Sequence, residues 1–227
     1  MIADTADIQN DLRGQRFNER AGKMINHTLV RSRRGALRLL LAALCSSAFA
    51  AEPVPWLLVA QPKFLAHQVV QPIAHAKETV LAAAQWTDIG PYFPSAAEWK
   101  DAGMDQIKLD LSTRHLAAQW LKSVKPHFER NDKKVIEFAL LKSDKVPVAA
   151  LVLAPEFLKE FQAIFGPKMI VMMPNLYTVY IFPGVAGRHQ AYSEHVLADW
   201  HSTAPKVSRE VFELTATGLR AVGIFEE

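Results

Sequence analysis

The order of the elements in the last hundred residues constrains the fold more than any other feature of the sequence. Residues 135–141 and 146–153 are apolar runs of strand length, separated by turn residues at 143–145. The segment Pro155–Phe165 carries phenylalanines at helical spacing, begins with proline and ends before a Gly-Pro pair. Together these runs predict a strand–strand–helix unit.

The same pattern recurs immediately afterwards. Residues 169–173 and 176–182 are rich in apolar, β-branched and aromatic residues and predict two strands. Residues 189–201 then predict a helix, and a hairpin over 211–225 ends the chain. The order ββα-ββα-ββ predicts an α+β fold, in which an antiparallel sheet carries its helices mainly on one face.

The part of the chain before residue 108 is harder to interpret. Its recognisable patterns are a strand at 56–60, an alanine-rich and partly helical stretch at 67–84, a Pro/Gly-rich loop at 89–94 and a short helix capped by Ser95. The first long helix is predicted at 112–128 from its apolar stripe. We expect residues 51–107 to form one continuous globular unit with an α+β domain over residues 108–227.

Residues 1–50 have the features of an export signal. Four arginines between positions 31 and 38 precede eleven uncharged residues at 39–49, and Ala48 and Ala50 stand at the alternate positions that a signal peptidase accepts. We expect cleavage before Ala51 and a periplasmic or secreted mature protein. Eleven apolar residues are too few for a membrane-spanning helix, which needs about 20. Membrane contact is therefore expected only transiently, through the signal.

Two points about this signal stay open. Met24 offers a conventional start, which would make residues 1–23 an over-long gene start, whereas a genuine extended n-region is the alternative. Arg33 and Arg34 resemble the twin-arginine export motif, although Ala36 stands where that motif prefers phenylalanine. Both the general secretory route and the twin-arginine route are thus compatible with the sequence.

Removal of the signal changes the charge and the cysteine content. Residues 1–50 hold eight of the 26 Lys and Arg and four of the 23 Asp and Glu, which leaves 18 basic and 19 acidic residues, a net of −1. A nucleic-acid partner requires a basic patch on the folded domain, so we expect none. Cys45 leaves with the signal, and a cysteine-free domain suits an oxidising compartment such as a bacterial periplasm.

The residues that most often carry chemistry form no recognisable motif. His189, His195 and His201 stand six residues apart, so on a helix successive rings turn by about 240° and cannot share one metal ion. Ser208 could reach His201 and Asp199 only through a particular fold, which keeps a periplasmic hydrolase assembled from distant residues as the alternative function. We predict no catalytic residue, no cofactor and no metal site.

Three residues are candidates for a recognition surface. Asn175 and Tyr177 lie beside a predicted turn and are expected to be exposed, and Arg188 follows Gly187 ahead of a helix, where an anion could bind. The leading hypothesis is an exported, non-catalytic binding or interaction domain. Its partner would be an envelope protein or a small ligand.

Three segments carry a resemblance to known sequences. Residues 174–183 (PNLYTVYIFP), 205–212 (PKVSREVF) and 218–223 (GLRAVG) resemble the C-terminal region of uncharacterised bacterial proteins, where a strand ending in Phe-Pro precedes a helix and a Ser-x-x-Val-Phe hairpin. The resemblance covers about a third of the chain. It implies an α+β fold and no known activity.

Overall fold

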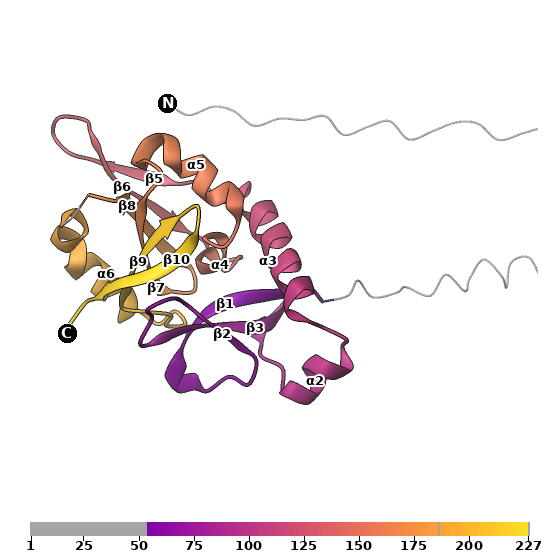
Figure 1. Ribbon diagram of the computed structural model, residues 1–227. Helices are drawn as coiled ribbons and strands as arrows, with labels where there is room; N and C mark the ends of the chain where they lie inside the picture. The colour runs from indigo at the N-terminus through magenta and orange to yellow at the C-terminus, as the bar shows by residue number, and fades with distance from the viewer. Residues whose placement is uncertain (1–53, 186, 227) are drawn as a thin grey trace, which may run out of the picture. The chain divides into compact units, whose positions relative to one another are not determined.

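The computed structural model describes residues 54–226 apart from residue 186, and these belong to the compact unit Glu52–Glu227. Their strands form two antiparallel sheets, A and B, with helices around and between them (Figure 1). The predicted export signal, its cleavage residues Ala48, Ala50 and Ala51 and the alternative start at Met24 lie outside the described residues. No helix in the described part is long and apolar enough to cross a membrane.

Sheet A consists of β1 (Trp56–Pro62), β2 (Val70–Pro72), β3 (Thr79–Thr87) and β4 (Gly90–Tyr92). The central strand β3 pairs with β1 on one side and with β2 and β4 on the other. The strand predicted at 56–60 is confirmed, but the helical prediction for 67–84 is wrong. Ala82, Ala83 and Ala84 are buried in β3, where their small side chains let neighbouring elements pack closely on both faces. Tertiary packing here overrides the helix propensity of alanine.

Two helices follow sheet A. Helix α2 (Ala96–Asp101) is capped by Ser95 as predicted, with Glu98 completing a capping box. Helix α3 (Gln106–Leu121) begins six residues earlier than predicted, because the Asp105 carboxylate caps it by accepting the N–H of Lys108. The predicted helical end at 122–128 is wrong, since Phe128 lies in a strand.

Sheet B has six antiparallel strands in the order β10-β9-β7-β8-β6-β5. Their bounds are His127–Arg130 for β5, Ile136–Lys142 for β6, Met169–Asn175 for β7, Thr178–Pro183 for β8, Glu210–Thr215 for β9 and Gly218–Ile224 for β10. The α+β class is confirmed, and the strands and main helices follow the order ββα-ββα-ββ. The first pair of strands in this order is β5 and β6, whereas the sequence predicted a pair formed by residues 135–141 and 146–153.

Residues 146–153, predicted to be a strand, instead contain a short helix. Helix α4 (Val148–Leu151) is buried at all four positions and contacts β1 of sheet A and β8 of sheet B. A continuous apolar run of this length is compatible with either a buried strand or a buried helix. Because α4 lies between two sheets, it needs apolar side chains all around its axis.

Both faces of sheet B are covered. Helices α4 and α5 (Pro155–Phe165) pack on one face, where α3 contacts both helices and β1. Helix α6 (Ser193–Trp200), preceded by the 3₁₀ turn η2 (Arg188–Tyr192), packs on the other face. The predicted bounds of α5 are confirmed, and Phe157 and Phe161 are fully buried. The helical spacing also places Ile164 and Phe165 on the buried face. Phe165 is buried as predicted, whereas Ile164 is 42% exposed.

Candidate binding cleft

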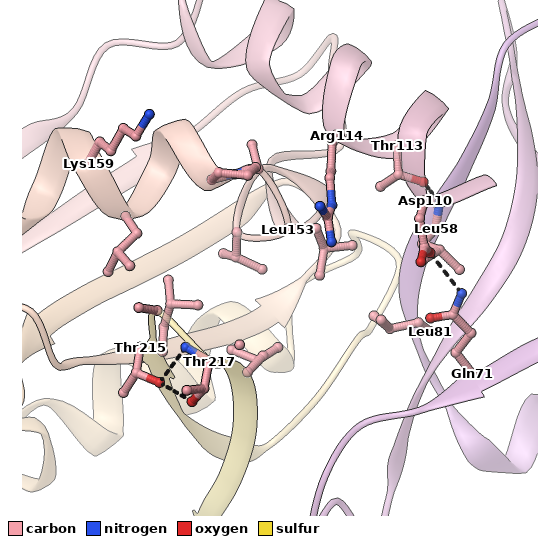
Figure 2. Close-up of a pocket in the computed structure, with 18 of the residues that line it drawn as sticks. Leu58, Gln71, Leu81, Asp110, Thr113, Arg114, Leu153, Lys159, Thr215 and Thr217 are labelled. Carbon is pink, nitrogen blue, oxygen red and sulfur yellow. Dashed lines mark hydrogen bonds between the residues drawn. The ribbon is translucent and has the colours of Figure 1, made fainter. Parts of the chain in front are cut away.

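A cleft lies between the two sheets in the described residues. It has a volume of about 620 Å³, and Figure 2 shows the side chains that line it. Its lining comes from segments far apart in the sequence, namely β1, β2 and β3, helices α3 and α5, the segment that joins α4 to α5, and the ends of β9 and β10 with the turn between them. This volume lies within the range of about 300–1,000 Å³ that is typical of small-molecule sites.

The wall of the cleft is mainly apolar. Leu81, Leu153, Leu158 and Leu219 line it, and each is half-buried and packed against a hydrophobic core. One side of these leucines is therefore fixed by the core, while the other side faces the cleft. Such a surface gains free energy when an apolar group displaces water from it.

Two cations and one carboxylate lie among the lining residues. Arg114 extends from α3 into the space above Leu153 (Figure 2). In the part of the chain that the structure describes, neither Arg114 nor Lys159 has a hydrogen-bond or ion-pair partner. Asp110, in contrast, accepts hydrogen bonds from the side-chain amides of Gln71 at 3.0 Å and Gln106 at 3.2 Å. With two cations and one carboxylate, the lining of the cleft carries a net positive charge.

The lining of the cleft includes no His, Cys or Ser, which are the side chains that most often act as nucleophile or general base. The described residues also contain no group of three His, Cys, Asp or Glu side chains placed to hold a metal ion. An unpaired guanidinium above an apolar wall can hold an anionic group whose remainder is apolar.

The predicted exposure of Asn175 is wrong. Asn175 ends β7 and is 2% exposed, while the turn itself is formed by Leu176 and Tyr177. Its side-chain amide donates to the backbone carbonyl of Asp199 at 3.0 Å, and its oxygen accepts the N–H of Tyr177 at 3.0 Å. Asn175 and Tyr177 do line a shallow hollow of about 440 Å³, but Arg188 lies outside that lining.

In the structure, the side chains of Ser208 and Asp199 bond to partners other than each other. Ser208 is 3% exposed, and its hydroxyl lies 2.6 Å from that of Thr79. Asp199 accepts hydrogen bonds from Lys142 at 3.0 Å and Tyr180 at 2.6 Å. Burial and the Asp199 carboxylate both raise the pKa of Tyr180 above its usual range.

The three histidines of the metal argument have different surroundings. His195 and His201 are exposed, whereas His189 is half-buried with a buried Nδ1 that has no partner within the described residues. Burial lowers the pKa of His189 below its ordinary value. Nothing in this arrangement brings the three rings to one point.

Comparison with known proteins gives no relative from which to transfer a function. No family model matches this chain, and no curated protein or solved structure matches it either. The resemblance of residues 174–183, 205–212 and 218–223 to uncharacterised bacterial proteins therefore stays a prediction.

Sequence reasoning did not find the cleft. Arg114 stands off the apolar stripe of its helix, as solvated residues usually do, and Leu219 reads as an ordinary strand residue. No local pattern joins them, because they meet only after both sheets have formed. Their juxtaposition required the structure.

Proposed function

We propose that this chain is an exported protein of the bacterial envelope whose folded domain binds a small ligand without transforming it. The export signal predicted over residues 1–50 supports the periplasmic or secreted location. The observation that carries the binding role is the unpaired guanidinium of Arg114 above the leucine wall of the cleft. This combination suits a ligand that carries one carboxylate on an apolar body.

Each part of such a ligand has a matching surface. A guanidinium can take a carboxylate through two parallel N–H···O bonds, which fixes orientation as well as affinity. The apolar body would lie against Leu153, Leu158 and Leu219. Asp110 on the same lining disfavours a second negative charge. We therefore expect monocarboxylates to bind better than dicarboxylates.

Titration calorimetry with octanoate tests the proposal. Octanoate should bind, while acetate, which lacks the apolar body, and octanol, which lacks the charge, should bind much more weakly. Arg114→Gln should weaken octanoate binding about tenfold, since a hydrogen bond to a charged group contributes roughly 1.5–3 kcal/mol. Arg188→Gln, a change at an exposed arginine outside the cleft, is the matched control and should leave the affinity unchanged.

Two results would contradict this function. Equal octanoate affinity of the wild type and Arg114→Gln would exclude the cleft as the anion site. The competing hydrolase requires turnover, which release of nitrophenol from p-nitrophenyl octanoate would reveal. Turnover that disappears in Thr217→Trp, a substitution at an exposed residue that would fill the cleft, would favour the hydrolase.

A further inference from the structure

A second surface, outside the cleft, combines exposed apolar side chains with a fixed backbone. After β1 the chain makes one 3₁₀ turn, η1 (Lys63–Leu65), in which Phe64 is 75% exposed and Leu65 is 47% exposed. The turn closes on Ala66, whose backbone is left-handed at φ 51° and whose N–H bonds to the carbonyl of Lys63 at 3.0 Å. A left-handed alanine persists only where its surroundings hold it.

The base of the turn is tied to the rest of the domain. The backbone N–H of Lys63 donates to the carbonyl of Glu78 at 2.7 Å, and its ammonium donates to the carbonyl of Ala76 at 2.7 Å. Phe64 and Leu65 therefore stand on an anchored turn. Anchored, exposed apolar side chains at one place mark an interaction surface more often than isolated ones do.

Three lysines lie close to Phe64 or to Trp200, which line one hollow. Lys63 and Lys77 line a hollow of about 320 Å³ together with Phe64 and Trp200. The ammonium of Lys206 lies 5.0 Å from the centre of the Trp200 ring. In the described part of the chain, the ammonium of Lys77 has no hydrogen-bond or ion-pair partner.

One carboxylate lines the hollow together with Lys63 and Lys77. Glu78, which lines the same hollow, accepts from Arg209 at 3.4 Å. Lys63, Lys77 and Arg209 outnumber Glu78 in the lining, so the hollow is positively charged, although residues 51–227 carry a net of −1. Local positive charge on a nearly neutral domain is complementary to an anionic surface.

We propose that this face docks reversibly on membranes that contain anionic phospholipids. Phe64 and Leu65 would enter the interface between headgroups and acyl chains, where apolar side chains gain free energy by leaving water. Lys63, Lys77 and Lys206 would meet the lipid phosphates, and the hollow beside Phe64 can receive one headgroup. Two apolar side chains give weak binding, so the attachment depends on charge and on ionic strength.

Co-sedimentation with vesicles tests this docking. Protein purified after export should sediment with vesicles of equal parts phosphatidylglycerol and phosphatidylcholine in 50 mM NaCl. It should stay in solution with phosphatidylcholine alone, and 500 mM NaCl should release it. Variants prepared in the same way keep the same N-terminal segment, so its contribution to vesicle binding is equal in all of them. Differences in binding between the variants therefore arise from the substituted residues.

Matched substitutions separate this face from the rest of the surface. Phe64→Ser should lower the partition coefficient about tenfold, whereas Ile89→Ser, at a fully exposed isoleucine in the β3–β4 turn, should not change it. Lys77→Gln should lower the partition coefficient about fivefold, because one basic residue near an anionic membrane surface contributes about 1 kcal/mol. Lys133→Gln should leave the partition coefficient unchanged. Because all four residues are exposed, the variants should fold normally.

Any of three outcomes would overturn the proposal. Equal sedimentation with the two kinds of vesicle would show that anionic lipid is not recognised. An equal loss of binding in Phe64→Ser and Ile89→Ser would show that the η1 face is not the site. Complete absence of vesicle binding would also exclude the membrane and leave this face to a protein partner.

Discussion

The hydroxyl of Thr113 binds the edge of β1 to helix α3. The hydroxyl oxygen accepts the backbone N–H of Leu58 at 2.8 Å, and the hydroxyl O–H donates to the carbonyl of Leu109 at 2.8 Å. All three residues are buried. Ser112 adds a bond from its hydroxyl to the carbonyl of Trp56 at 2.5 Å. Because β1 is an outer strand of sheet A, these side chains occupy an edge that could otherwise pair with another chain.

Loss of the Thr113 hydroxyl should lower the stability of the folded domain. Thr113→Val keeps the shape of the side chain but leaves the Leu58 N–H buried without a partner, which lowers the unfolding free energy by about 1–3 kcal/mol. Thr113→Ser keeps the hydroxyl and should cost less. Urea unfolding of the three proteins measures the difference. A Val variant as stable as the wild type would mean that the Leu58 amide finds another acceptor.

Helix α5 depends on Phe161 for its attachment to the core. Phe161 is fully buried in the middle of the helix, where fraying cannot relieve the loss. Phe161→Ala should lower the unfolding free energy by roughly 3–5 kcal/mol, a large share of the ~5–15 kcal/mol of a whole domain. Glu160→Ala, at the exposed neighbour, should cost within about 0.5 kcal/mol. Equal urea midpoints for the two variants would contradict the packing described for α5.

The elements that sequence reasoning placed well are those with chemical signals at their ends. Pro155 and Gly166 bound α5, and Gly166 has a φ of 88°, which few other residues tolerate. Ser95 and Glu98 likewise mark the start of α2. The failures are segments without such signals, namely the alanine-rich β3 and the fully apolar α4. Their conformation is decided by the elements that surround them.

The candidate site was less predictable than the fold. Asn175 was expected at the surface because it lies beside a predicted turn, and turns are usually exposed. In the structure β7 continues through Pro174 and brings Asn175 against the end of α6. Arg114 gave no signal, since its role depends on the leucines of distant elements. A binding site made of long-range contacts leaves little trace in local periodicity.

Acid should weaken the domain through Glu213. This carboxylate on β9 has a side chain that is 7% exposed, and it is paired with Lys168 and with Arg220, the latter at 2.6 Å. The hydrogen bond from Lys168, and then the one from Arg220, hold the pKa of Glu213 below its usual 4.5. The folded protein therefore binds this proton less readily than the unfolded chain does. The stabilisation is complete above pH 4.5 and is lost as the pH falls through the lowered value.

Urea midpoints between pH 3 and pH 7 measure this loss. Glu213→Gln should be less stable than the wild type at pH 7, and the difference should narrow toward pH 3 because the variant has no proton to bind at this position. Glu156→Gln, at an exposed carboxylate in the first turn of α5, should follow the wild type throughout. A constant difference between wild type and Glu213→Gln would exclude Glu213 from the acid response.

The predicted export signal specifies one N-terminus. Because Ala48 and Ala50 occupy the alternate positions of a signal peptidase site, protein exported by a bacterial host should begin at Ala51 or within a residue or two of it. N-terminal sequencing of the exported fraction measures this directly. Recovery of exported protein that still carries residues 1–50 would show that this segment is not a cleaved signal.

Asn175 is expected to act on stability. Asn175→Ala leaves the N–H of Tyr177 and the carbonyl of Asp199 without their partner. Since Asn175 itself is 2% exposed, the unfolding free energy should fall by about 1–3 kcal/mol. Asn175→Asp should also destabilise, because it replaces the donor to Asp199 with a second acceptor. Tyr177→Phe, which keeps the backbone N–H, should stay within about 0.5 kcal/mol of the wild type. Urea unfolding of the three variants tests whether Asn175 stabilises the contact between the β7–β8 turn and α6. If Asn175→Ala were as stable as the wild type, Asn175 would again be a candidate for ligand recognition.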